Sequence, residues 1–184
     1  MSMNQQSQSH GATLAYVALG ANIGEREQSL RSAIERLDGC EGIRVVGCSP
    51  IYQTQPVGVI DQPLFLNMVV VAETTLDAHP FFEQMMLVEQ SLGRTREVHW
   101  GPRIIDLDLL WFGEQTIDSA QLTVPHPHMF ERAFVLAPLL DVVRQFSPNK
   151  QSLIADCLQR QPDKEDVQLW IHIDWQTASG RSAN

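Results

Sequence analysis

Lysine is scarce in this chain of 184 residues, and the glycine-rich signatures of common nucleotide-binding loops are missing. Lys150 and Lys164 are the only lysines, and neither belongs to a G-x-x-x-x-G-K-[ST] segment, which excludes a P-loop kinase. The segment from Gly20 to Gly24 lacks the G-x-G-x-x-G spacing and is better read as a turn into a helix. The catalytic-loop signature of protein kinases is also missing. Any chemistry on a nucleotide must therefore depend on other residues.

Cysteine and long apolar runs are also rare. Cys40, Cys48 and Cys157 form no C-x-x-C pair, and an odd number at irregular spacing indicates free thiols rather than a disulfide framework. No apolar run is long enough to span a bilayer, and residues 1–13 carry neither the basic nor the apolar region of a secretory signal. We therefore expect a cytoplasmic protein that does not bind membranes.

The charge is strongly acidic, with 13 basic and 22 acidic residues and a formal net charge of −9. Such a surface argues against nucleic acid as a partner, because both carry the same sign, and a polyanion would need a local basic pocket. Hydrophobic residues make up 43% of the chain, enough for one core. We expect a single domain over residues 14–174, a disordered polar tail over 1–13 and a frayed tail over 175–184. Composition does not determine the oligomeric state, and a monomer is the expectation.

Hydrophobic periodicity predicts an α+β fold. The predicted strands are Leu14–Gly20, Ile43–Thr54 with an interruption near Ser49-Pro50, Phe65–Thr74 and Ile104–Phe112, and the predicted helices between them are Glu25–Asp38 and Asp77–Leu92. Beyond them we expect a short strand pair in Ile117–Val124, a helix over Met129–Val142 broken at Pro138, a helix over Ser152–Gln161 and a strand over Val167–Ile173. A direct strand-to-strand connection between two helices favours a ferredoxin-like, mostly antiparallel sheet with helices on one face and C-terminal additions.

The strongest chemical signal is a pair of aspartates on the last of these central strands. Side chains alternate along a strand, so Asp106 and Asp108 project from one side, and the other side carries Ile105, Leu107, Leu109 and Trp111. Two neighbouring carboxylates repel each other unless a cation lies between them, and hard oxygen ligands suit Mg²⁺. The alternative is the ordinary polar outer face of an edge strand.

A cluster of arginines lies just before this strand, in an otherwise acidic chain. Arg94, Arg96 and Arg103 could bind phosphate oxygens through their planar guanidinium groups. The alternative is a solvated loop that pairs with nearby acids such as Glu89 and Glu97. Carboxylates that hold a metal, a metal that holds phosphates and arginines that neutralise the rest would form one coherent site.

Histidine and aromatic residues give weaker signals. His126 and His128 have no third soft ligand nearby, so a phosphate contact or an ordinary loop role is favoured over a zinc site. Phe65, Trp100 and Phe134 could stack on a flat heterocycle, although a single aromatic residue more often belongs to the core.

Several separated motifs together resemble the hydroxymethyl-dihydropterin pyrophosphokinase family. They are Ala18–Gly24 (ALGANIG), Tyr52–Thr54 (YQT), Phe65–Asn67 (FLN), Gly93-Arg94, Trp100–Arg103 (WGPR) with Asp106-x-Asp108, Val124–Met129 (VPHPHM), Arg132 and Phe134. The resemblance covers roughly residues 14–142, in the right order. It implies an ATP-dependent transfer of diphosphate to the hydroxymethyl group of dihydropterin, with release of AMP, in folate biosynthesis.

The resemblance also implies site residues. Asp106 and Asp108 would bind two Mg²⁺ ions, and Arg94, Arg96 and Arg103 would act with them in catalysis. The residues implied at the ATP site are Glu89, Arg94, Arg96, Trp100, Arg103, Leu109, Leu122, Thr123, His126 and Arg132. Those implied at the pterin pocket are Thr54, Val57, Phe65, Asn67, Trp100 and Phe134.

Some positions depart from the pattern of the family. They are Gln55, Phe65, Gln121 and Pro127, and they bear on peripheral affinity rather than on the reaction. Two alternatives stay open at this point. One is another metal-dependent nucleotidyl transferase that shares the strand with the aspartate pair. The other is a ferredoxin-like module that binds a nucleotide without turnover.

Overall fold

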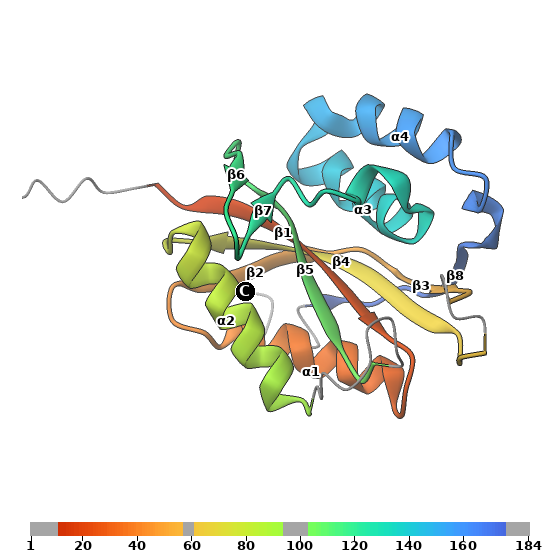
Figure 1. Cartoon of the computed structure of the whole chain (residues 1–184), viewed down its shortest axis with the longest axis horizontal. Coiled ribbons are helices and arrows are strands. Elements are labelled where there is room, and N and C mark those ends of the chain that lie inside the picture. Colours follow the sequence, from red (N-terminus) through yellow and green to blue (C-terminus); the bar gives the residue numbers. More distant parts are fainter. Residues whose placement is uncertain (1–10, 57–60, 94–102, 176–184) are drawn as a thin grey trace, which may run out of the picture.

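A computed structural model describes residues 11–56, 61–93 and 103–175 of the chain (Figure 1). The described strands and helices are, in order, β1 (Thr13–Ala21), α1 (Arg26–Asp38), β2 (Ile43–Cys48), β3 (Ile51–Thr54), β4 (Phe65–Thr74), α2 (Ala78–Ser91), β5 (Asp106–Phe112), β6 (Ile117–Asp118), β7 (Thr123–Val124), α3 (Ala133–Phe146), α4 (Gln151–Gln159) and β8 (Gln168–Ile171). Short 3-10 turns occupy Met129–Glu131, Pro148–Lys150 and Lys164–Asp166. Among these residues, none of the helices is long and apolar enough to cross a membrane.

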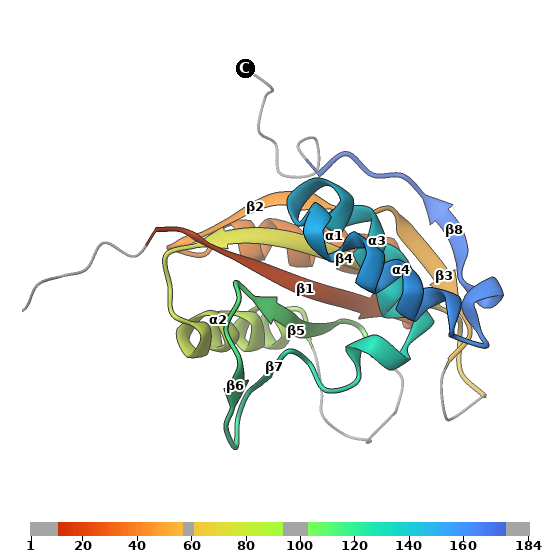
Figure 2. The ribbon, with the colours of Figure 1, turned by 90° about the horizontal axis from the view of Figure 1, so that it is seen from above.

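The larger sheet has six described strands in the order β5-β1-β4-β3-β8, with β2 also paired to β4. All of its pairings are antiparallel. When β2 and β3 are counted as one split strand, the order of the first five strands is that of a ferredoxin-like sheet, which confirms the predicted fold class. The view from above shows β8 at one edge and the β6–β7 hairpin beside β5 (Figure 2).

The split between β2 and β3 is the interruption predicted near Ser49-Pro50. Ser49 is 1% exposed, and its backbone N–H donates to the Val69 carbonyl at 2.8 Å. Its hydroxyl oxygen accepts the Val69 N–H at 3.0 Å. Ser49 therefore satisfies both backbone groups of Val69 at the point where Pro50 interrupts the hydrogen bonding to β4.

One face of the sheet packs on α1 and α2, as the sequence predicts. Alternate residues of β1, namely Ala15, Val17 and Leu19, belong to this core. The helices contribute Leu30, Ile34 and Leu37 from α1 and Phe81, Met85 and Val88 from α2. The period of 2 in the strand and of 3.6 in the helices brings these apolar sides together.

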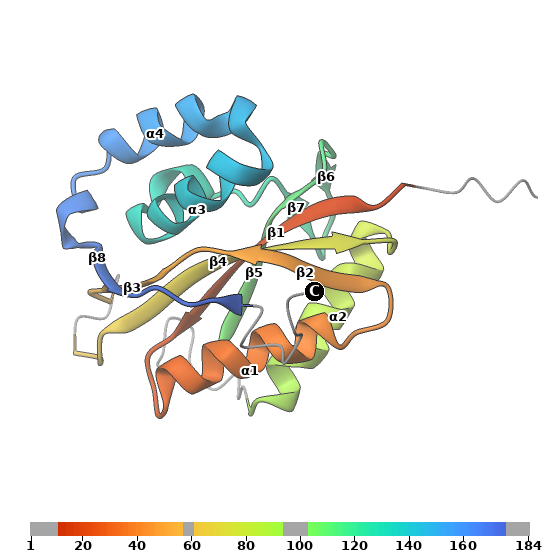
Figure 3. The ribbon, with the colours of Figure 1, turned by 180° about the vertical axis from the view of Figure 1, so that it is seen from behind.

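The other face is covered by α3 and α4, so the helices lie on both faces and not on one (Figures 1 and 3). Tyr16 from β1 belongs to this second core, and its hydroxyl is 2.6 Å from that of Ser147, just after α3. The Tyr52 hydroxyl of β3 donates to Asp141 Oδ2 of α3 at 2.6 Å. The C-terminal additions are thus what buries the second face of the sheet.

Two further details of the sequence prediction are wrong. Tyr16 pairs with Trp111 but Val17 pairs with Leu109, so β5 carries an extra residue, Leu110. This bulge turns Trp111 to the α3 side, 5.7 Å from the Tyr16 ring, away from the face of Leu109. Pro138 does not break α3, which continues from Ala133 to Phe146. It removes one hydrogen-bond donor, and burial of the same helix face against the sheet offsets that loss.

Candidate active site

The register of β1 brings residues from distant parts of the chain into one row across the sheet. Gly20 pairs with Asn67 of β4 on one side and with Asp106 of β5 on the other. Ala18 pairs with Asp108 in the next row on the same face. Because paired residues point to the same side of a sheet, the two aspartates and Asn67 face one space.

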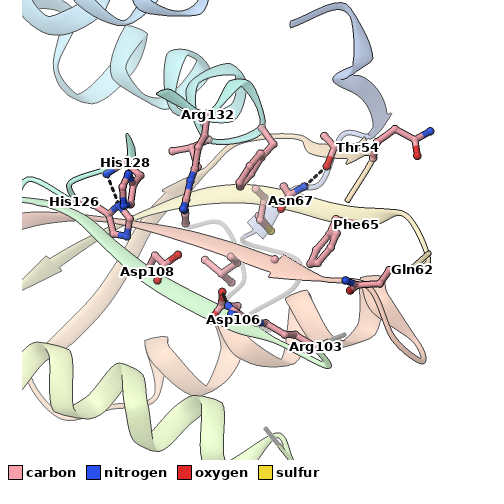
Figure 4. Close-up of a pocket in the computed structure, with 17 residues that line it drawn as sticks. Thr54, Gln62, Phe65, Asn67, Arg103, Asp106, Asp108, His126, His128 and Arg132 are labelled. Carbon is pink, nitrogen blue, oxygen red and sulfur yellow. Dashed lines mark hydrogen bonds and ion pairs between the residues drawn. The ribbon is translucent and has the colours of Figure 1, made fainter. Parts of the chain in front are cut away.

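That space is a pocket between the sheet and the start of α3 (Figure 4). Its lining residues are Ala18, Leu19, Gly20, Thr54, Gln55, Gln62, Phe65, Asn67, Met68, Arg103, Asp106, Asp108, His126, His128, Arg132, Phe134 and Val135. It has a volume of about 260 Å³, just below the range of roughly 300–1,000 Å³ that is typical of small-molecule sites.

The end of the pocket at β3 and β4 combines an aromatic ring with polar side chains. Asn67 Nδ2 donates to Thr54 Oγ1 at 2.7 Å, and both residues are 6% exposed. Phe65 lies beside them in the same pocket. Gly20 leaves room here, because a Cβ atom at that position would lie 3.0 Å from Asn67 Oδ1 and 3.9 Å from Phe65 Cδ1. An aromatic wall with amide and hydroxyl groups suits a flat, polar heterocycle.

The opposite end carries the charges. Asp106 and Asp108 are half-buried on β5, and the Arg103 guanidinium forms an ion pair with Asp106. Arg132, at the start of α3, lies across the pocket from the aspartates, with its guanidinium carbon 5.8 Å from the centre of the Phe134 ring (Figure 4). Two carboxylates therefore face two arginines, a combination that can hold a cation and an anion together.

His126 is a neutral imidazole in this setting. Burial, and then the positive charge of Arg132 and the neighbouring His128, lower the pKa of His126 to about 4, and Asp106 opposes the shift. His126 Nδ1 accepts the backbone N–H of His128 at 3.2 Å, a role that requires an unprotonated nitrogen. At neutral pH the ring can therefore donate from Nε2 into the pocket without carrying a charge.

The donor set fits Mg²⁺ bound together with phosphate. Asp106 and Asp108 offer hard oxygen ligands on a rigid strand, and Mg²⁺ commonly binds one or two carboxylates and completes its shell with water and substrate phosphates. Within the described ranges, no group of three or more His, Cys, Asp or Glu side chains could hold a metal by itself. Among the described residues, Asp106 and Asp108 are thus the candidate protein ligands.

Four residues implied at the ATP site do not line this pocket. Glu89 of α2 is 1% exposed, and its Oε1 accepts the backbone N–H of Leu107 at 2.6 Å, between the two aspartates of β5. Leu109 and Leu122 are buried in the core on the α1–α2 side, and Thr123 is exposed on β7.

Other predicted residues cannot be placed. Val57, Arg94, Arg96 and Trp100 lie outside the described residues. The rest of the predicted set is brought together: Thr54, Phe65, Asn67, Arg103, Asp106, Asp108, His126, Arg132 and Phe134 all line the pocket.

Sequence reasoning missed Gln62 as a pocket residue and gave His128 no firm place. Both line the pocket. Gln62 lies in a segment without periodicity, between Pro56 and Pro63, and in the structure it contacts Asn22 (3.2 Å between Asn22 Nδ2 and Gln62 Oε1). No local signal could have found it.

Known proteins resemble this chain in sequence. Residues 16–144 match the family described as 7,8-dihydro-6-hydroxymethylpterin-pyrophosphokinase. The chain is 45% identical over 157 residues to the 2-amino-4-hydroxy-6-hydroxymethyldihydropteridine pyrophosphokinase of Bacillus subtilis, which covers 85% of this chain and 90% of that protein. It is 42% identical over 127 residues to the same enzyme of Pseudomonas aeruginosa, a match that covers 69% of this chain and 78% of that protein.

Solved structures support the fold. A crystal structure of a Plasmodium falciparum HPPK-DHPS triple mutant with STZ-DHP has a TM-score of 0.65 at 14% identity. The match covers 89% of this chain and 47% of that longer chain, so this chain spans less than half of it. At this identity the likeness bears on the fold alone.

Proposed function

Since this chain belongs to the 7,8-dihydro-6-hydroxymethylpterin-pyrophosphokinase family, we propose that the pocket beside Asp106 and Asp108 is where it carries out the reaction of that family. The protein transfers a diphosphate group from ATP to hydroxymethyl-dihydropterin in folate synthesis, and the family uses Mg-ATP. The observation that carries the site is the row Asn67, Gly20 and Asp106, which joins a polar-aromatic pocket to a carboxylate pair.

The pterin binds at the end formed by β3 and β4. Phe65 and Phe134 offer faces for the bicyclic ring, and Asn67 and Thr54 offer an amide and a hydroxyl for its polar edge. By their match to the family, Val57 and Trp100 are further pterin-binding residues in this proposal. The hydroxymethyl group then points toward Asp106, because the row across the sheet runs in that direction.

The triphosphate binds at the charged end. Arg103 and Arg132 neutralise phosphate oxygens, together with Arg94 and Arg96, and neutral His126 donates a hydrogen bond. Asp106 and Asp108 would hold two Mg²⁺ ions, which supply further positive charge to the phosphates when bound. The adenosine lies toward α2 and β7, where Glu89, Leu109, Leu122 and Thr123 match the family.

Positioning sets the outcome of the transfer. The hydroxymethyl oxygen attacks the β-phosphorus of ATP, a new O–P bond forms, and the bond from that phosphorus to the α–β bridging oxygen breaks. The hydroxyl proton is lost, and AMP leaves with the bridging oxygen. Residues that hold the two substrates in fixed positions therefore contribute more to the rate of transfer than a strong acid or base would.

Product analysis tests this assignment. The protein is incubated with ATP, Mg²⁺ and hydroxymethyl-dihydropterin, and the products are identified by phosphorus NMR. AMP and a pterin diphosphate are expected. ADP with a pterin monophosphate would contradict the direction of attack, and an adenylylated pterin with free diphosphate would indicate a nucleotidyl transferase. Binding without turnover would leave only a nucleotide-binding module.

The organisation of the protein is part of the same proposal. We propose one domain over residues 14–174, active as a monomer, since the described helices pack in two cores on the two faces of the six-stranded sheet. We also propose the cytoplasm, because Cys40, Cys48 and Cys157 are free thiols and ATP is the co-substrate. Light scattering with activity at nanomolar enzyme, and cell fractionation, test these two points.

A further inference from the structure

Asn22, the residue after β1, is a buried junction between two segments that border the pocket. It is 1% exposed. Its backbone N–H donates to the Arg103 carbonyl at 3.0 Å, and its Oδ1 accepts the Arg103 N–H at 2.7 Å. Its Nδ2 donates to Gln62 Oε1 at 3.2 Å and to the Pro63 carbonyl at 3.3 Å. One side chain thus joins the residues before β4 to the residue that leads into β5.

The two segments belong to different ends of the pocket. Gln62 lines the pocket and precedes Phe65, on the side assigned to the pterin. Arg103 lines it beside Asp106, on the side assigned to the phosphates. A second bond supports the first segment, because Arg26 Nη1 of α1 donates to the Leu64 carbonyl at 2.6 Å. The end of β1 and the start of α1 are therefore the common anchor.

We propose that Asn22 is a positioning residue that holds the pterin side and the phosphate side of the pocket at a fixed separation. The proposal rests on the function and site given above. Asn22 does not line the pocket, so it acts through Gln62 and Arg103. The reaction needs two substrates aligned at one phosphorus atom, and a displacement of about 1 Å far from the chemistry can cost about 100-fold in rate.

Only asparagine has the groups that this junction uses at this length. The carboxamide accepts from Arg103 with its oxygen and donates with its nitrogen toward the segment before β4. Aspartate keeps the acceptor but has no donor, and it places a charge against the Pro63 carbonyl. Alanine removes all three side-chain hydrogen bonds and leaves the backbone bond from Asn22 N–H to the Arg103 carbonyl. The two variants therefore break the junction in different places.

The kinetics of these variants test the proposal. Asn22→Asp should raise KM for the pterin by about 10-fold with a smaller change in KM for ATP, since only the bonds toward Gln62 and Pro63 are lost. Asn22→Ala should show the same rise in KM for the pterin and also lower kcat by about 10- to 100-fold, because the Arg103 backbone N–H loses its bond to Asn22 Oδ1. If both variants keep wild-type KM and kcat at a temperature where they are folded, the proposal is wrong.

Thr74→Val is the matched control. Thr74 is 2% exposed, its hydroxyl donates to the Gly42 carbonyl at 2.8 Å, and it accepts the Leu76 N–H at 3.1 Å. It lies at the opposite end of β4 from Asn67. It should lose stability as Asn22→Ala does, yet keep both KM values and kcat. Equal kinetic damage in Thr74→Val would reduce the Asn22 effect to general destabilisation and overturn the proposal.

Gln62→Ala keeps the proposal testable if Asn22→Ala does not fold. In the Asn22→Asp background, Gln62→Ala should raise KM for the pterin only slightly further, because the bond between residues 22 and 62 is already broken. Fully additive effects on KM for the pterin would overturn the proposal. Wild type and Thr74→Val are assayed in parallel. If these two do not convert the substrates, the proposed function fails, whereas loss confined to the Asn22 variants supports the junction.

Discussion

Gly20→Ala is expected to weaken pterin binding while leaving the fold almost unchanged. The new Cβ atom would lie 3.0 Å from Asn67 Oδ1, several tenths of an ångström closer than an ordinary contact, and 3.9 Å from Phe65 Cδ1. The Asn67 amide must therefore shift, and its 2.7 Å bond to Thr54 lengthens or breaks. Backbone strain does not enter, because Gly20 is not among the glycines of positive φ.

The magnitudes separate binding from stability. Loss of the Asn67 hydrogen bond costs about 1 kcal/mol of folding free energy, and replacing glycine by alanine at a compatible position returns about 0.4–1 kcal/mol through the unfolded chain. The fold should thus be within about 1 kcal/mol of wild type. A displaced amide that no longer meets the pterin costs about 1–3 kcal/mol of binding, which is roughly 5- to 150-fold in affinity.

The assay is KM for the pterin at saturating Mg-ATP, beside the affinity for Mg-ATP alone and the midpoint of thermal unfolding. Gly39→Ala is a matched control: its new Cβ would lie 3.4 Å from the Glu35 carbonyl oxygen, in ordinary contact and at the end of α1. Its kinetics should equal those of wild type. An unchanged KM for the pterin in folded Gly20→Ala, or an equal loss of affinity for both substrates, would refute the assignment of this end of the pocket.

Three further outcomes are expected. Asp106→Ala and Asp108→Ala should each lose several kcal/mol of transition-state stabilisation and keep their unfolding midpoint, as judged by single-turnover kinetics with increasing Mg²⁺; near-normal turnover in both would remove the metal assignment. Glu89→Leu should lower the free energy of unfolding by about 1–3 kcal/mol and weaken the dependence of that free energy on Mg²⁺. Glu89→Gln still accepts the Leu107 N–H, so it should retain most of the stability and most of its Mg²⁺ dependence in denaturant titrations with and without Mg²⁺. Because the pKa of His126 falls from 6.5 to about 4 on folding, wild type should lose stability as pH drops from 6.5 to 4, when only the unfolded chain takes up this proton, and His126→Asn should show a smaller loss by urea denaturation in EDTA.

Local pattern determined much of this protein. The strand β4 was predicted with the bounds that the structure has, since its β-branched run and its flanking turns are contiguous. The placement of Asp106 and Asp108 on one face of a strand was also predicted, since it requires only the alternation of side chains. The separated motifs further indicated the family, and with it the reaction.

Tertiary structure decided what depends on register between distant segments. The row that joins Asn67, Gly20 and Asp106 exists only because β1 pairs with β4 and β5 at one particular offset. The bulge at Leu110 reverses the side of Trp111, and periodicity within one strand cannot indicate an extra residue relative to its partner. Asn22 likewise looked like a turn residue, and its four hydrogen bonds to Gln62, Pro63 and Arg103 arise only once β1, the segment before β4 and the start of β5 lie side by side. Local alternation is set by the backbone of each residue, whereas register is set by packing of the whole sheet, so it appears only in the folded chain.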